Sequence, residues 1–187
     1  MLENKEKVAV TAKNKEAHTN NNWKLRLEDK EFVEWIKEKK SHILFFDGAT
    51  KNNPGKAGVR GVKLDPNGQK IITYEWSLGE MTNNRAEAYN FLLGTRLLNK
   101  NAIKDSIIIG DSAIMIAALD AKRDFKSIAI NKIYQRIRTS FESLGNITLK
   151  HVLRNQNKDA NSHANKATDI PVGIFKENNE VYEESIS

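Results

Sequence analysis

Three carboxylates in this sequence are candidates for a functional site. Asp47 closes the apolar run ILFFD, and Asp111 closes the apolar run IIIGD. A charged group at the end of a buried strand is costly unless it meets a polar environment. Glu87 lies one turn into a helix that the segment TNNRAE is predicted to open. Each residue alone has an ordinary alternative, namely a turn, a helix N-cap, or a Glu that complements the helix dipole.

Together the three carboxylates offer hard oxygen ligands, with no His or Cys among them. Mg²⁺ and Mn²⁺ prefer ligands of this kind. Open α/β sheets bind their ligands beyond the carboxyl ends of the strands, where Asp47 and Asp111 are predicted to lie. Clustered carboxylates also repel one another, so we expect raised proton affinities at these positions until a cation binds.

The elements that would position these residues alternate between strand and helix patterns. Short apolar runs predict strands, and apolar residues at three- and four-residue spacing predict helices. The expected order is strands at 42–47, 58–64 and 71–76, a helix at 83–101, a strand at 106–109, helices at 112–121 and 128–141, a strand at 147–152 and a helix at 158–168. This order predicts a mixed α/β fold, with a five-stranded sheet of three antiparallel and then two parallel strands, flanked by helices.

The length of 187 residues predicts one domain with polar ends. Residues 1–41 are expected to form a polar leader, largely disordered, with a short amphipathic helix at 29–40. The globular domain is expected at 42–170, followed by a C-terminal tail at 171–187.

Composition narrows the class of protein. A net charge of +6 and a pI near 9.4 favour a polyanionic partner, although a solvated basic surface explains the same numbers. The absence of Cys excludes a disulfide scaffold and a zinc finger. No apolar stretch approaches the roughly 20 residues of a membrane span, and MLENKEKVAV lacks the apolar core of a signal peptide. We therefore expect an intracellular protein that is not secreted and has no membrane partner.

Four segments resemble, in order, the motifs of the type 1 ribonuclease H family: FDGATKNNPGKAG, TNNRAEAYN, IIIGDS and HVLRNQNKDANSHANKAT. The resemblance covers about residues 43–170. The last motif, with its short loop, is similar to that of plant-type retrotransposon polyproteins. The resemblance implies an endonuclease that cuts the RNA strand of an RNA–DNA hybrid with two Mg²⁺ ions, for which Mn²⁺ can substitute.

The catalytic and metal-binding residues of the family carry over by this resemblance. Asp47, Glu87 and Asp111 fall on the first three carboxylates, and Asn161 falls where a fourth, an Asp, is expected. An Asn keeps an oxygen acceptor but loses the charge, so it should bind a cation more weakly. Asp159 cannot simply replace it, since two residues along a helix correspond to about 200° of rotation, and Asp159 would point away unless the helix starts late. Two explanations stay open: an inactivating Asp→Asn substitution, or a domain that has abandoned cutting.

Contacts to the nucleic acid are also implied by the resemblance. Gly48 would let the backbone approach a sugar, and Asn83 and Asn84 would reach 2′-hydroxyls and base edges in a minor groove. Thr82 and Asn53 would meet phosphates of the DNA strand. Without the motif, turn-forming Asn and N-capping Thr would be the preferred interpretation.

The mobile His of the family has no secure counterpart here. His151 is expected on the last strand, because HVLRNQN is shorter than the commoner loop, and His163 is expected inside the last helix. The chain also lacks the basic insertion that some relatives use to hold the hybrid. The basic residues of the corresponding region are better explained as a solvated helix face; they are Lys122, Arg123, Lys126, Lys132 and Arg136.

The leading hypothesis is therefore a ribonuclease H, impaired by Asn161, acting as a monomeric domain on RNA–DNA hybrids. Reverse transcriptase or other polyprotein neighbours are expected as further partners, which would place it in the cytoplasm, the nucleus or a retroelement particle. The alternative is a non-catalytic hybrid-binding or tether domain of a retroelement polyprotein. A DNA-processing nuclease of the same fold fits poorly with the Asn pair, which suits ribose recognition.

Overall fold

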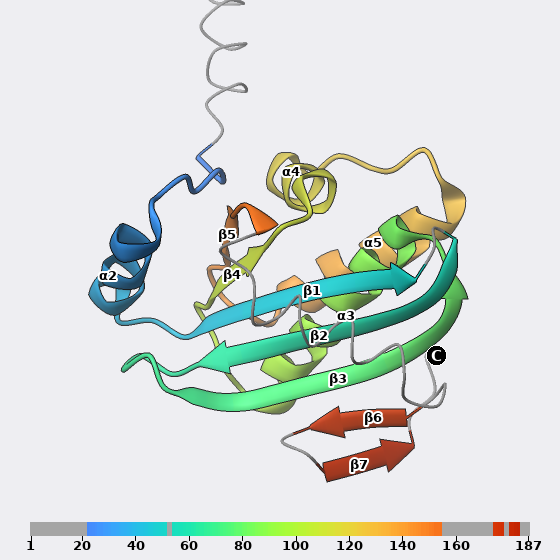
Figure 1. The fold of residues 1–187 in the computed structure, drawn as a ribbon. Helices are drawn as coiled ribbons and strands as arrows, with labels where there is room; N and C mark the ends of the chain where they lie inside the picture. The colour runs from blue at the N-terminus through green and yellow to red at the C-terminus, as the bar shows by residue number, and fades with distance from the viewer. Residues whose placement is uncertain (1–21, 52–53, 155–173, 178–179, 184–187) are drawn as a thin grey trace, which may run out of the picture.

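A mixed sheet forms the centre of the protein (Figure 1). The computed structural model describes residues 22–51, 54–154, 174–177 and 180–183. The main strands run in the spatial order β5-β4-β1-β2-β3, and they are β1 (Ile43–Lys51), β2 (Gly55–Leu64), β3 (Lys70–Met81), β4 (Ile107–Gly110) and β5 (Thr148–His151). The first three pair antiparallel, whereas β1, β4 and β5 are parallel. The predicted five-stranded mixed sheet is confirmed.

A hairpin extends this sheet beyond β3. It consists of β6 (Ile174–Glu177) and β7 (Glu180–Glu183), which pair antiparallel with each other. β6 also pairs antiparallel with β3, so the sheet has seven strands in all. The segment predicted as a tail therefore contains sheet structure.

Four helices of the described part pack on the sheet, and three of them begin at a capping hydroxyl. They are α2 (Asp29–Lys39), α3 (Asn83–Lys100), α4 (Ala113–Ala121) and α5 (Ile128–Phe141). Thr82, Ser112 and Ser127 are the N-caps of α3, α4 and α5, and each hydroxyl accepts a hydrogen bond from the N–H three residues on. The helix predicted at 158–168 lies outside the described residues. No helix of the described part is long and apolar enough to cross a membrane.

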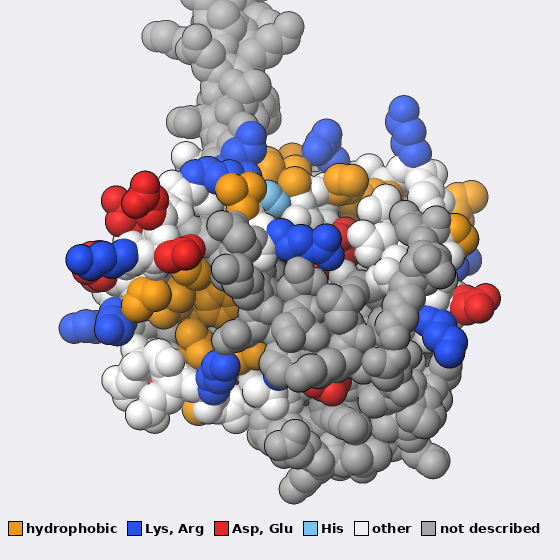
Figure 2. All heavy atoms as spheres, in the orientation of Figure 1, with side chains coloured by type: hydrophobic (Ala, Val, Ile, Leu, Met, Phe, Trp, Pro, Cys, Tyr) orange, Lys and Arg blue, Asp and Glu red, His pale blue; other side chains and the backbone are white. Residues whose placement is uncertain are grey.

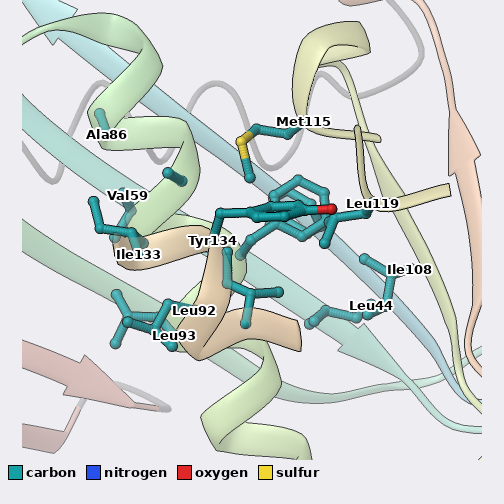
Figure 3. Close-up of a cluster of buried hydrophobic side chains, with 14 of the residues drawn as sticks. Leu44, Val59, Ala86, Leu92, Leu93, Ile108, Met115, Leu119, Ile133 and Tyr134 are labelled. Carbon is teal, nitrogen blue, oxygen red and sulfur yellow. The ribbon is translucent and has the colours of Figure 1, made fainter. Parts of the chain in front are cut away.

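The larger hydrophobic core lies between the sheet and helices α3, α4 and α5. Figure 3 shows the ring of Tyr134, from α5, among side chains of α4, α3 and the strands. Its hydroxyl donates a hydrogen bond of 2.9 Å to the Ala118 carbonyl of α4, which satisfies the buried polar atom. On β1, Leu44 and Phe46 point into this core.

A second core covers the opposite face of the sheet. Ile43 and Phe45 alternate with Leu44 and Phe46 along β1, so they project to this other side. Here α2 and the segment before it contribute Phe32 and Leu25, both less than a tenth exposed. Figure 2 shows hydrophobic side chains gathered beside α2 on this face. Residues 22–39, in the predicted leader, therefore share a core with the domain.

β1 is longer than the sequence predicted. The prediction that Asp47 closes its strand is wrong, because β1 continues to Lys51. The strand is extended by pairing with β2, which runs from Ile43 opposite Leu64 to Lys51 opposite Lys56. Long-range pairing of this kind is not visible in a local apolar run.

Replacing Phe32 with Ala should destabilise the whole protein. Phe32 is 7% exposed and packs in the second core, whereas its neighbour Val33 is 50% exposed. Removing the Phe32 ring leaves a cavity in this core, which should lower the free energy of unfolding by about 3 kcal/mol. The matched control, Val33→Ala, should change it by less than about 0.5 kcal/mol. Urea unfolding of both variants measures the difference, and equal effects would show that α2 does not stabilise the sheet.

Candidate active site

The register of β1 against β4 brings two of the predicted carboxylates together. Phe46 of β1 lies opposite Gly110 of β4, and this is the last pair of the parallel ladder. Asp47 and Asp111 are the next residues on the two chains. Asp47 therefore stays in β1, paired with β2, at the point where β1 and β4 separate. The sheet thus places both carboxylates beside the carboxyl end of β4, where open α/β sheets bind their ligands, although Asp47 itself lies within β1.

Helix α3 brings the third carboxylate to the same place. A Cβ atom on Gly48 would lie 3.0 Å from the Ala86 carbonyl carbon and 3.1 Å from the Glu87 nitrogen. These contacts are tighter than most real Cβ contacts, so any larger residue at position 48 would require α3 or β1 to shift by a few tenths of an ångström. One turn further along α3, the buried Asn90 accepts a hydrogen bond of 2.9 Å from the Tyr74 hydroxyl and donates one of 3.2 Å to the Arg60 carbonyl. These contacts hold the helix that carries Glu87.

The three carboxylates line one hollow of about 220 Å³. Its other lining residues come from α3 and from β5 and the turn after it; they are Asn83, His151, Val152, Leu153 and Arg154. Among the described residues, no three acidic or His side chains lie close enough together to bind a metal ion without rearrangement. Glu87 instead takes a hydrogen bond from Ser112, whose hydroxyl also caps α4. The structure thus brings Asp47, Glu87 and Asp111 to one hollow without assembling a set of metal ligands among the described residues.

Burial and the closeness of the carboxylates disfavour charge on Asp47 and Glu87. Burial, the nearby Asp111 and a side-chain hydrogen bond with Asp111 raise the pKa of Asp47 to about 8. Burial also raises the pKa of Glu87, and Asp111 raises it further, while the hydrogen bond from Ser112 lowers it. The expectation of raised proton affinities is confirmed for these two groups. A bound divalent cation would relieve this crowding, so the chemistry of the oxygen donors fits a metal.

Two residues at the hollow were not predicted as site residues. Arg154 lies 4.0 Å from the Asp111 carboxylate through its Nε, and its charge lowers the pKa of both Asp47 and Glu87. His151 lies on β5 as predicted, and its Nε2 is 3.1 Å from the backbone oxygen of Asp111. The motif HVLRNQN contains both residues, but only the fold shows that β5 ends beside β4.

The structure describes some, but not all, of the residues that were predicted to contact nucleic acid. Thr82 is the N-cap of α3, which is the ordinary alternative considered for it. Asn83 is half-buried and lines the hollow, whereas Asn84 is exposed on the first turn of α3. Asn53 and Asn161 lie outside the described residues.

A family model described as reverse transcriptase-like matches residues 45–167. The match begins on β1 and includes the three carboxylates. The chain belongs to this family. Its matched part excludes the N-terminal segment and α2, although both pack on the sheet.

Relatives of known identity narrow the family to type 1 ribonuclease H, as the motifs predicted. Ribonuclease HI of Halobacterium salinarum is 27% identical over 125 residues, which are 67% of this chain and 63% of that protein. The crystal structure of the type 1 enzyme from the same archaeon has a TM-score of 0.66 at 26% identity, covering 69% of this chain and 98% of that one. A compost-derived type 1 ribonuclease H, solved with an RNA/DNA hybrid, has a TM-score of 0.65 at 23% identity, covering 69% and 97%.

Replacing Asp47 with Asn should stabilise the metal-free protein. The folded-state pKa of Asp47, about 8, lies above its ordinary value of 3.8. The contribution of Asp47 to the free energy of unfolding is therefore fully present below pH 4 and is lost as the pH rises toward 8. Each pKa unit corresponds to about 1.4 kcal/mol, so D47N should gain at least about 2 kcal/mol at pH 8 in chelator, and less at pH 5. Unfolding at both pH values measures this.

The exposed Asp120→Asn on α4 is the matched control, and it should change stability by less than about 0.5 kcal/mol at either pH. A D47N variant that is less stable than the parent at pH 8 would contradict the pKa assigned to Asp47.

Proposed function

We propose that this protein is an endoribonuclease that cuts the RNA strand of RNA–DNA hybrids with two divalent metal ions. The observation that carries the proposal is the meeting of Asp47, Glu87 and Asp111 at one hollow beyond the end of β4. The raised pKa values of Asp47 and Glu87 support it, since strongly perturbed carboxyl groups in a cleft are typical of functional sites.

Asp47, Glu87 and Asp111 would hold the ions, with Asn161 as a weaker fourth ligand. Mg²⁺ suits an all-oxygen set, and Mn²⁺ should substitute for it. Bound metals would activate a water and stabilise the leaving oxygen of the phosphodiester. Arg154 carries its charge to the same hollow, where it balances the carboxylates and offers a donor to a phosphate oxygen.

Recognition of a hybrid requires a group that distinguishes RNA from DNA. Asn83, in the wall of the hollow, and Asn84, exposed beside it on α3, supply amides that donate to and accept from 2′-hydroxyls. Thr82, Gly48 and Asn53 would contact the backbone of the nucleic acid. Two structures with the same fold support this substrate: the compost enzyme with its hybrid and a foamy viral protease–reverse transcriptase with an RNA/DNA hybrid.

The resemblance to this family also bears on the genetic element that encodes the protein and on its protein neighbours. The likeness of the last motif to retrotransposon polyproteins favours a retroelement origin, with a reverse transcriptase as neighbour. The competing function is hybrid binding without cutting, and Asn161 is the residue that favours it.

The full-length chain should cleave the RNA strand of a labelled hybrid and leave DNA duplexes intact. Hybrid, RNA duplex and DNA duplex of one sequence are offered with Mg²⁺ and then with Mn²⁺. Loss of one ligand charge should make the Mg²⁺ rate low, and Mn²⁺ should raise it because Mn²⁺ binds such sites more tightly. Glu87→Gln, which keeps the shape of the side chain, should abolish the activity. Cleavage that survives this change would exclude the proposed site.

Replacing Asn161 with Asp should raise the rate of hybrid cleavage. A missing electrostatic group commonly costs a hundredfold or more, about 3 kcal/mol of transition-state stabilisation. Hybrid affinity should change little, since binding depends mainly on phosphate and ribose contacts. Single-turnover rates and binding constants for both forms on one hybrid measure the two effects. An N161D form that folds and binds hybrid but stays inert would establish the binding function instead.

A further inference from the structure

The segment before α2 pairs with the β5 edge of the sheet through an isolated β-bridge. Lys24 forms a parallel bridge with His151. The His151 N–H donates to the Trp23 carbonyl at 2.6 Å, and the Leu25 N–H donates to the His151 carbonyl at 2.8 Å. This segment therefore lies directly against the one histidine that lines the hollow among the described residues.

The guanidinium of Arg26 contacts both the backbone carbonyl and the ring of His151. Its Nη1 donates to the His151 carbonyl at 2.9 Å, and its Nη2 lies 2.9 Å from His151 Nδ1. A guanidinium has only N–H donors and no acceptor. The Nδ1 atom must therefore be the acceptor, and in a neutral ring the proton then lies on Nε2.

The other side of the same ring reaches the candidate active site. Nε2 is 3.1 Å from the backbone oxygen of Asp111, so a proton on Nε2 makes the ring a donor to that carbonyl. The Trp23 ring packs edge-on against His151 at 5.8 Å, and His151 is 6% exposed, which leaves it little freedom to turn. Arg26, His151 and the Asp111 carbonyl thus form one hydrogen-bonded chain.

We propose that Arg26 is a positioning residue for the catalytic centre: it holds the His151 proton on Nε2, and His151 in turn fixes the backbone that carries Asp111. Only the expected effect on turnover rests on the nuclease function proposed above. Arg26 precedes residues 45–167, so the role belongs to the N-terminal segment and not to the part matched by the family. The arrangement follows the general logic in which a second residue sets the tautomer of a site histidine.

The first test observes the hydrogen-bonded chain without any substrate. Ring ¹⁵N spectra of the full-length chain should show His151 protonated on Nε2 alone, with its signal assigned among the four His by H151Q. In Arg26→Ala the ring should become a mixture of tautomers, and the amide of Ser112, which follows the Asp111 carbonyl, should shift. Lys24→Ala removes an exposed positive charge from the same segment and should change neither signal. An unchanged ring and amide in R26A would overturn the proposal.

The second test separates positioning from contact with the nucleic acid. In the form that cleaves hybrid, the parent or N161D, R26A should lower kcat about tenfold and leave KM within about twofold, because only the placement of a ligand changes. The H151Q side chain carries a fixed amide donor and acceptor, so R26A should have less than about a twofold effect in that background. A rise in KM that K24A reproduces would instead mean that Arg26 attracts the substrate, and would overturn the positioning role.

Failure of the nuclease function is distinguishable from failure of this inference. If neither the parent nor N161D cleaves hybrid, the proposed function fails, while the ring and Ser112 signals still decide whether Arg26 positions Asp111. Arg26→Lys provides the matched conservative variant. A single ammonium can donate to Nδ1 but cannot reproduce both bonds of the planar guanidinium, so it should restore the Nε2 tautomer in part.

Discussion

The parallel register between β1 and β4 is the constraint on which the site depends. The ladder ends with Phe46 opposite Gly110, so Asp47 and Asp111 follow it side by side. Close packing fixes this register, since a Cβ atom on Gly110 would lie 3.0 Å from the Phe46 ring. A slip of one residue would also move Leu44 and Phe46 out of the larger core. The energy of core packing therefore holds two carboxylates together although their charges repel.

The third carboxylate depends on how closely α3 approaches the sheet. Gly48 on β1 and Gly94 on α3 both lie where a larger side chain would meet the other element, either the backbone of Ala86 or the side chain of Leu44. The buried Asn90 side chain adds hydrogen bonds to the Tyr74 hydroxyl and the Arg60 carbonyl, which a shift of α3 along the sheet would break. Burial and proximity of the carboxylates disfavour their charges, and the apolar interface between the helices and the sheet offsets this cost.

The N-terminal segment links the edge of the sheet to this centre. An open edge at β5 would present unpaired backbone groups, and pairing with residues 23–25 covers part of it. The same segment leads into α2, which closes the second core around Phe32. Protection of the sheet edge, burial of apolar surface and support of His151 are therefore carried by one stretch of chain outside the matched family region.

The sequence by itself predicted helix α3 and the order of the first five strands along the chain, because hydrophobic periodicity is a local signal. The proposed site residues rest on another local signal, acids placed after apolar runs. It also identified His151 as a strand residue. Only the tertiary structure decided that β1 continues past Asp47, since this extension comes from pairing with β2. The sequence also did not predict the packing of Leu25 and Phe32 in the second core. Nor did it predict the contact between Arg26 and His151, which lie 125 positions apart. Such contacts depend on which surfaces the fold brings together, and short polar segments give no periodic signal of their partner.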